Sequence, residues 1–412
     1  MRSPYLKNDK PKLQWQEGSY AKPIENINLK QRFNNLLPLP WELWPSEARL
    51  LLSLILFWSV FGLFILGSAS WWVATKDMGD GAFFLKKQIT WLITSWIFSW
   101  LVISINLRKW LKVSRICLLI LLLLIGSTLI FGSNINGSSR WLILGPIRIQ
   151  PSELIKPFVI LQAANLFAQW KRITNSHKLF QITLFGVLIT LILMQPNLST
   201  ASLIGILLWM IALSSGIRFR YLFSFALLGI TLGGLSIYNY KYQLMRVTSF
   251  LNPWEDPHGN GYQLIQSLLA IGSGGMFGEG YGLSTQKLLY LPFISTDFIF
   301  AIFAEEFGFV GSLMLILFLA LVAFVGLRIS LRCRNNYSKL IAIGCSILLV
   351  GQSIMHIAVA SGSMPTTGLP LPMISYGGNS LLSSLTICGL LVRCSLESTG
   401  LIGGLKVKKK FS

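Results

Sequence analysis

Long apolar segments alternate with short polar or basic segments along the 412-residue chain. Many of the apolar segments approach the roughly 20 residues that an α-helix needs to cross a bilayer. They are continuously apolar rather than alternating, so helices that satisfy their own backbone hydrogen bonds are expected and barrel strands are not. The pattern predicts an all-α polytopic membrane protein with ten transmembrane helices, at residues 49–69, 86–105, 115–132, 153–169, 179–195, 199–216, 221–238, 298–327, 340–361 and 375–396.

The distribution of charge indicates how these helices are oriented. The formal net charge is +20, but the basic residues are spread over loops and tails with no nucleic-acid-binding module around them, so nucleic acid is excluded as a partner. Most of the 35 Lys and Arg residues fall on one side of the predicted helices, and the positive-inside rule places that side, with both termini, in the cytoplasm. The predicted domains are a basic cytoplasmic tail at 1–48, a transmembrane domain at 49–398 and a second basic cytoplasmic tail at 399–412.

The largest predicted loop, residues 239–297, lies on the outer face between the seventh and eighth helices. It is rich in Gly, Pro and polar residues, as in FLNPWEDPHGNGYQ and AIGSGGMFGEGYG. Long ordered loops are common places for functional residues. The alternative is that this loop is a disordered linker. Aromatic residues and apolar patches such as LIQSLLAIG favour ordered pieces that re-enter the membrane or lie at its surface.

The outward segment GSSRWLILGPIRIQPSELIKP combines two arginines with the start of a helix. Ser152 is expected to cap this helix, with Glu153 favourably placed in its first turn. Lys156 follows Glu153 by three residues, so the two side chains share a helix face and can pair. A capped helix with a lysine that extends to the membrane surface would explain these residues without a ligand. Arg140 and Arg148 nevertheless suggest an anionic ligand nearby.

Two further loops interrupt apolar runs on the outer side. MQPNLSTAS contains the candidate substrate-binding residue Gln195, and either Asn197 or Ser199 can cap the helix that follows. Read alone, this loop is typical of a structural turn. PTTGLPLPMISYGGNS contains a second candidate, Ser375, among several prolines and glycines. Irregular backbone at membrane depth is tolerated only inside protein or around water, so this loop is expected to line a cavity.

Three carboxylates occur in the otherwise apolar stretch YLPFISTDFIFAIFAEEFG. An Asp at the centre of a membrane helix costs about 2.5–3.5 kcal/mol, so an acid retained there is a functional candidate. Asp297 stands where the outer loop becomes a helix, and the structural alternative is a simple N-cap. Glu305 and Glu306 lie roughly 12–14 Å deeper, where capping is impossible, and are expected to be structural polar residues that face the bundle interior.

The sequence predicts no metal centre. Five cysteines, at 117, 333, 345, 388 and 394, have spacings that fit neither a zinc site nor a disulfide framework. The three histidines are far apart along the chain. We expect the cysteines to be structural.

Four of these motifs occur in the order found in the SEDS family (shape, elongation, division and sporulation), which the chain resembles over residues 50–395. They are RWLxLGPxxxQPSELxKP, QPNLST, the NPWxDPxGxGYQ to QKLxYLP to TDFIFAxxAEExG series, and PTTGLPLPxISYGGNS. The resemblance implies a ten-helix peptidoglycan glycosyltransferase that polymerises lipid II on the outer face of the bacterial plasma membrane, with Asp297 as its catalytic acid. It also implies a class B penicillin-binding protein and other division proteins as partners.

The chemistry of this reaction fits the residues present. Sugar transfer with a diphosphate leaving group needs a base for the acceptor hydroxyl and cations for the diphosphate. Asp297 is the expected base, and burial should raise its pKa enough for that role. The candidate diphosphate contacts are Arg140, Lys156, Arg246 and Lys287. No cofactor is required, although a divalent cation, Mg²⁺ or Mn²⁺, is a candidate helper.

The chain departs from the family pattern at three positions. Phe293 stands where the family usually has an acid, Ser295 where it usually has a histidine, and Asn197 where QPD would have its aspartate. Asp297 therefore remains the sole acid of that outer-face motif. QKL and GYQLIQSLLAIGSGG are more similar to the division branch of the family than to the elongation branch, which predicts septal cell-wall synthesis.

Two other functions use the same architecture. A transporter that flips lipid II would need the same helices and a cavity, but not the carboxylate of Asp297. A non-catalytic scaffold would only position the penicillin-binding protein.

Overall fold

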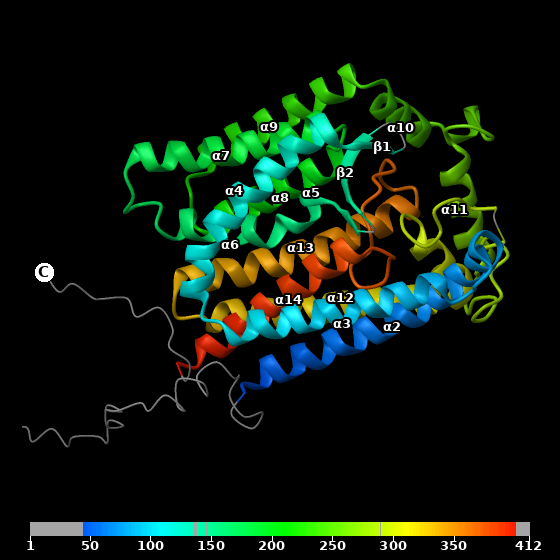
Figure 1. Cartoon of the computed structure of the whole chain (residues 1–412), viewed down its shortest axis with the longest axis horizontal. Coiled ribbons are helices and arrows are strands. Elements are labelled where there is room, and N and C mark those ends of the chain that lie inside the picture. Colours follow the sequence, from blue (N-terminus) through cyan, green and yellow to red (C-terminus); the bar gives the residue numbers. More distant parts are fainter. Residues whose placement is uncertain (1–43, 136–137, 146, 289, 401–412) are drawn as a thin grey trace, which may run out of the picture. The chain divides into compact units, whose positions relative to one another are not determined.

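The computed structural model describes residues 44–135, 138–145, 147–288 and 290–400. Most of both predicted basic tails therefore lies outside the described residues. The described chain is mainly helical (Figure 1), with helices α2 (Ser46–Met78), α3 (Phe83–Ser104), α4 (Leu107–Phe131), α5 (Pro151–Leu154), α6 (Lys156–Ala168), α7 (Asn175–Met194), α8 (Leu198–Ser214), α9 (Phe219–Asn239), α10 (Lys241–Leu251), α11 (Tyr262–Ser273), α12 (Ile299–Arg332), α13 (Asn336–Ala360) and α14 (Gly378–Ser398).

Each of the ten predicted transmembrane segments overlaps a helix, and segment 153–169 is divided between α5 and α6. The division occurs at Ile155 because Pro157, in the first turn of α6, has no backbone N–H to continue the ladder. Among the described residues, seven helices are long and apolar enough to cross a membrane, namely α2, α4, α7, α9, α12, α13 and α14. The chain is thus a polytopic, mainly α-helical membrane protein.

Helix α14 forms the centre of the bundle, between α2, α3, α12 and α13 (Figure 1). Most of its residues are buried, and many are small, which allows neighbouring backbones to approach closely. A Cβ atom on Gly389, for example, would lie 2.9 Å from the carbonyl oxygen of Ser99 on α3. At one end, Arg393 is paired with Glu397 at 2.9 Å and donates to the carbonyl oxygen of Ile103 at 3.1 Å. This contact fixes α14 against the end of α3.

Helix α12 is broken at Gly308, which sequence analysis did not predict. Gly308 has φ 65° and ψ −163°, a conformation that favours glycine. At the break, Phe309 N–H donates to Gly275 O at 2.9 Å, and Glu279 N–H donates to Glu305 O at 2.9 Å. The loop after α11 therefore pairs with the backbone that the break exposes, so the polar groups at this depth are satisfied by protein.

A short antiparallel sheet, with strand order β1-β2-β3, corrects the purely α-helical prediction. Its strands are β1 (Ser133–Ile135), β2 (Ser138–Leu144) and β3 (Ile147–Ile149), and Ile143 is paired with Arg148. The sequence did carry signals for it, since Asn136-Gly137 is a typical hairpin dipeptide and Gly145-Pro146 is a turn signal. The strands are only three to seven residues long, so a search for long apolar segments does not detect them.

Loop 239–297, which we call the outer loop after its predicted location, contains α10 and α11 and is ordered over its described residues. A disordered linker is therefore excluded for this part of the chain. Figure 1 shows α10, α11 and the sheet at the same end of the bundle, and the loops that join α6 to α7 and α12 to α13 at the opposite end. The residues of the candidate site come together at the first of these ends.

Candidate functional site

Asp297 lies in a tight turn at the end of the outer loop, directly before α12. The backbone N–H groups of Thr296 and Asp297 donate to the carbonyl oxygen of Phe293 at 3.1 and 3.0 Å. Phe293 has a φ of 55°, which is strained for a bulky side chain and occurs most often at functional sites. The N-cap of α12 is Phe298, and no side chain caps it. The alternative that Asp297 is a simple N-cap is therefore wrong, and its half-buried carboxylate is open to other roles.

Arg246, on α10, reaches the same place from the outer loop. Its Nη1 donates to the carbonyl oxygen of Thr366 at 2.9 Å, and its Nη2 donates to the hydroxyl of Tyr242. The guanidinium also lies over the Tyr242 ring, 4.5 Å from the ring centre. A Cβ atom on Gly368 would lie 3.5 Å from Asp297 Oδ2 and 4.0 Å from Arg246 Nη1, so the two charges face each other beside this glycine.

Arg140, on β2, is held by the QPN turn between α7 and α8. It donates to the carbonyl oxygens of Gln195 and Pro196. Gln195 is buried, and its amide nitrogen donates to Ile125 O at 3.2 Å, so this residue supports the turn. Asn197 caps α8, because its side chain accepts from Thr200 N–H at 3.2 Å. The sheet thus places Arg140 against a turn that α4 and α8 make rigid.

The pKa values of Asp297 and Arg140 are shifted because both side chains are partly buried. Burial raises the pKa of Asp297 above its ordinary 3.8, while the positive charges of Arg246 and Arg140 and a hydrogen bond from Thr296 lower it. Burial lowers the pKa of Arg140 to about 10, and the neighbouring Arg246 acts in the same direction. Arg140 still carries its charge at neutral pH. Within the described residues, none of these three groups forms an ion pair.

Ser375 anchors the loop between α13 and α14 to the turn that carries Asp297. Its hydroxyl donates to the carbonyl oxygen of Thr296 at 2.6 Å and accepts from Leu371 N–H at 2.8 Å. Tyr376 N–H donates to Ser295 O at 2.8 Å. The loop is packed inside the protein, as irregular backbone at this depth requires. Ser375 is buried and its hydroxyl is used within the chain, so the structure gives it a positioning role beside Asp297.

Lys156 lies in a buried polar network that reaches the loop carrying Gly368. Its Nζ is 2.6 Å from Glu153 Oε1 and donates to Gln352 Oε1 at 3.1 Å, and the lysine is only 1% exposed. The amide of Gln352 in turn donates to the carbonyl oxygen of Pro370 at 2.8 Å, in the loop that carries Gly368. The predicted pairing of Glu153 with Lys156 is present. Ser152 was expected to cap the helix, and this was wrong, because the N-cap is Gln150.

Lys287, Glu305 and Glu306 connect the outer loop to α12 and α2. Lys287 Nζ is 3.0 Å from Glu306 Oε1, and Ser68 on α2 donates to the same carboxylate at 2.5 Å. Glu305 accepts from the backbone N–H and the hydroxyl of Thr285, both at 2.9 Å. Both glutamates are buried, with exposures of 0% and 2%. Of the four predicted diphosphate contacts, the structure therefore brings only Arg140 and Arg246 beside Asp297 with their charges unpaired.

Sequence analysis missed three contributors to the site, namely Tyr242, Thr366 and Gly368. Tyr242 precedes Arg246 by four residues on α10, a spacing that could have indicated their contact. Thr366 contributes only its carbonyl oxygen, for which a side-chain pattern carries no signal. Gly368 has a φ of 69°, and its position between two prolines was a signal for a special turn.

Comparison with known proteins gives consistent matches over nearly the whole chain. The family model for FtsW, RodA and SpoVE, described as "Cell cycle protein", matches residues 48–400. The chain is 51% identical over 357 residues to a probable peptidoglycan glycosyltransferase FtsW of Synechocystis sp., which covers 86% of this chain and 91% of that protein. It is 35% identical over 364 residues to a probable peptidoglycan glycosyltransferase FtsW of Escherichia coli, covering 86% and 88% of the two chains.

Solved structures give the same result. A chain of a peptidoglycan synthase complex, studied for how polymerisation and crosslinking are coordinated, superimposes with a TM-score of 0.71 at 26% identity and covers 87% of this chain and 99% of that one. The rod shape determining protein RodA of Thermus thermophilus superimposes with a TM-score of 0.64 at 26% identity, covering 86% of this chain and 97% of that one.

Proposed function

The chain belongs to the family of FtsW, RodA and SpoVE, and from this we propose that it is a peptidoglycan glycosyltransferase that polymerises lipid II into glycan strands during septal cell-wall synthesis. The observation that carries the proposal is the geometry around Asp297. A half-buried carboxylate stands beside two arginines, and all three charges are unpaired within the described chain. Such a site offers a base and an anion-binding group to one ligand.

In the proposed reaction, Asp297 takes the proton of the 4-hydroxyl of the acceptor GlcNAc. The oxygen attacks the anomeric carbon of the donor MurNAc, a new glycosidic bond forms, and the bond from that carbon to the diphosphate oxygen breaks with inversion. Undecaprenyl diphosphate leaves with the bonding electron pair. The raised pKa of Asp297 makes it a better base than an exposed aspartate.

Arg246 and Arg140 are the proposed partners of the diphosphate. The negative charge on the leaving group grows as the bond breaks, and fixed guanidinium groups stabilise it without having to reorient. Lys156 and Lys287 are neutralised by Glu153 and Glu306, so we assign them to holding the site rather than to the substrate. Gln195 and Ser375 position Arg140 and Asp297 respectively.

A divalent cation is not needed in any of these steps. Within the described residues, no group of three or more His, Cys, Asp or Glu side chains could hold a metal ion. A Mg²⁺ or Mn²⁺ ion would therefore enter with the diphosphate of the substrate. Its chemical contribution would be additional positive charge at the leaving group.

We further propose ten membrane crossings with both termini in the cytoplasm. The crossings add α3, the α5–α6 pair and α8 to the seven helices that are long and apolar enough to cross a membrane. The positive-inside rule then places the site at the outer face of the plasma membrane, where lipid II is polymerised. A class B penicillin-binding protein at the division septum is the proposed partner, which agrees with the similarity to a chain of a peptidoglycan synthase complex.

Purified protein with labelled lipid II, with and without the penicillin-binding protein, tests this function. We expect long glycan chains from the native protein, and about 10²- to 10⁴-fold less product from Asp297→Asn, because a general base is lost. Asp77→Asn makes the same chemical change at an exposed carboxylate at the end of α2 and should keep full activity. Transport of lipid II in vesicles without any polymer would instead support a flippase, and inactivity in both assays a scaffold.

A further inference from the structure

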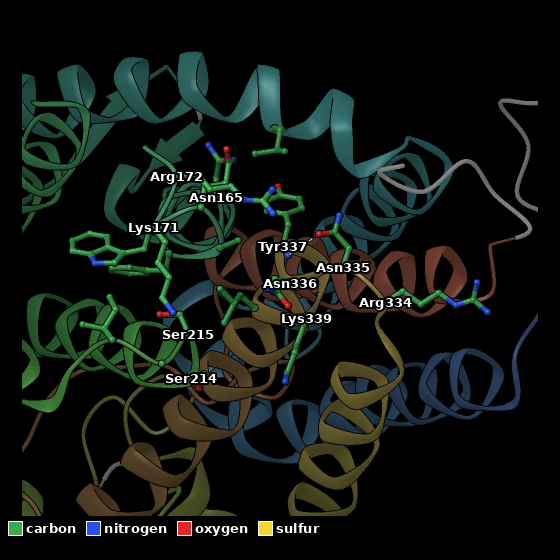
Figure 2. Close-up of a pocket in the computed structure, with 18 residues that line it drawn as sticks. Asn165, Lys171, Arg172, Ser214, Ser215, Arg334, Asn335, Asn336, Tyr337 and Lys339 are labelled. Atoms are coloured by element: carbon green, nitrogen blue, oxygen red, sulfur yellow. Dashed lines mark hydrogen bonds between the residues drawn. The ribbon is translucent and has the colours of Figure 1, made fainter. Parts of the chain in front are cut away.

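A polar cavity lies at the opposite end of the bundle from Asp297. It has a volume of about 930 Å³ and is formed by the loops that join α6 to α7, α8 to α9 and α12 to α13. Figure 2 shows Lys171, Arg172 and Lys339 on different sides of the group of lining residues, whereas Arg334 extends away from it. Nothing in the proposed reaction uses this cavity, because the site of Asp297 is built from other elements.

The positive charges of this cavity have no partner within the described chain. Lys171, Arg172, Arg334 and Lys339 line it, and no Asp or Glu does. None of these four side chains takes part in an ion pair or hydrogen bond among the described residues. The described carboxylates at this end of the bundle are already paired: Glu47 with Arg328 and Arg332, and Glu397 with Arg393.

The remaining lining residues have two kinds of surface. Asn336 provides a neutral hydrogen-bonding group, whereas the hydroxyls of Ser214 and Ser215 already donate to the carbonyl oxygens of Met210 and Ala212. Helix α13 begins here, so the positive end of its dipole adds to the charge. Trp170 and Phe167 provide apolar surface beside them. A ligand that matches both surfaces carries a phosphate-like anion and an apolar part.

We propose that this cavity binds the phosphate headgroup of an anionic phospholipid from the inner leaflet. Basic pockets between transmembrane helices on the cytoplasmic side recognise such headgroups, and this one lies at the ends of membrane helices, where a headgroup arrives by lateral diffusion. The cavity is much larger than an inorganic phosphate, and its apolar walls suit the glycerol and the start of the acyl chains. The assignment to the inner leaflet depends on the orientation proposed above, whereas the binding itself does not.

The test uses the full chain purified in a non-ionic detergent and native mass spectrometry to count bound lipids. The probes are phosphatidylglycerol, phosphatidylcholine and inorganic phosphate. The cavity variant is Lys171→Gln/Arg172→Gln/Lys339→Gln. The matched control, Arg108→Gln/Lys109→Gln/Lys112→Gln, removes the same charge from exposed positions on α4 that do not line the cavity. Polymerisation of lipid II by both variants reports that the fold is intact.

We expect the native chain to bind phosphatidylglycerol in preference to phosphatidylcholine. The affinity should fall on the order of 100-fold in the cavity variant and less than about threefold in the control. The charge-conserving variant Lys171→Arg/Arg172→Lys/Lys339→Arg should retain the affinity, and Lys171→Gln alone should lower it about fivefold. Equal losses in the cavity and control variants would overturn the proposal, as would inorganic phosphate binding as tightly as the lipid.

Discussion

The carboxylates at the end of the bundle that carries Asp297 fall into two regions, which differ in whether each negative charge is paired with a positive one. Glu306 is buried against Lys287 and Ser68, and Glu153 against Lys156, at distances typical of strong hydrogen bonds. Asp297 is half-buried near two arginines, yet each arginine is held by backbone carbonyls and not by the acid. In the first arrangement, which we call the closed region, each carboxylate is paired with a lysine of the chain. In the second, which we call the open region, the charges of Asp297 and of the two arginines are unpaired within the described chain.

This difference separates structural from functional charge. A buried ion pair holds its elements together because removal of one partner leaves an uncompensated charge. A carboxylate whose cations are fixed nearby but unpaired can accept a proton from one ligand group while the cations bind another. Position in a sequence motif does not distinguish Lys287 from Arg246. Their partners do, because Lys287 pairs with Glu306, whereas Arg246 donates to a backbone carbonyl.

The largest stability effect is expected in the closed region. Glu306→Gln leaves Lys287 buried without its counter-charge, and we expect a loss of about 3–5 kcal/mol in the free energy of unfolding, measured by chemical denaturation in detergent. Lys287→Met/Glu306→Met removes both charges and should recover most of that loss. The exposed pair of Lys86 and Asp80 is the control, and Asp80→Asn should change stability little. Equal losses from Glu306→Gln and Asp80→Asn would remove the distinction between the regions.

In the open region, substitutions should lower the activity rather than the stability. Arg246→Gln is expected to lower the rate of lipid II polymerisation about 10²- to 10³-fold, because a fixed positive charge at the leaving group is lost. The melting temperature should change little. Lys241→Gln, at an exposed position on the same helix, should leave the rate unchanged. A large drop in melting temperature for Arg246→Gln would show that this arginine is structural, like the paired charges of the closed region.

The pH dependence of the rate sharpens the comparison further. Asp297 acts as a base only when deprotonated, so the rate should fall as pH falls through its raised pKa. Arg246 lowers this pKa, and Arg246→Gln should therefore move the acidic limb of the pH–rate profile to higher pH. An unchanged limb would show that the titrating group is not Asp297.

The same shift has a consequence for stability. Because the folded pKa of Asp297 is raised above its unfolded value, its contribution to stability is fully present below the unfolded pKa and is lost as pH rises through the folded pKa. Asp297→Asn should remove this dependence, and the stability of the variant relative to the native chain should increase between acidic and neutral pH. Denaturation of both proteins at several pH values measures it.

The smallest effect is expected at Gly368. Gly368→Ala introduces a side chain at a φ of 69°, and we expect a loss of about 1 kcal/mol together with a severalfold lower rate, because the new methyl group would lie 3.5 Å from Asp297 Oδ2. Gly351→Ala, on α13 with open space around the new methyl group, should be neutral or slightly stabilising. If both variants behave alike in melting and rate, the left-handed turn has no special part in the site.

The helices could be predicted from the sequence because a bilayer requires long apolar segments. Each of the ten predicted segments overlaps a helix. The sequence also identified Asp297 as an isolated acid at a helix boundary, and the pairing of Glu153 with Lys156 from their spacing. The pairing of Lys287 with Glu306 could not be derived, because it depends on how the outer loop folds back on α12. The break at Gly308 was equally hidden, since glycine also occurs inside intact membrane helices.

The break in α12 determines how movement reaches the acid. The loop after α11 bridges the break, because Glu279 N–H donates to Glu305 O before Gly308 and Gly275 O accepts from Phe309 N–H after it. Both parts of α12 are therefore hydrogen-bonded to the same loop. A force applied to the outer loop, for instance by a bound protein, is therefore transmitted to both parts of α12, and the turn that holds Asp297 moves with the helix rather than about a hinge at Gly308.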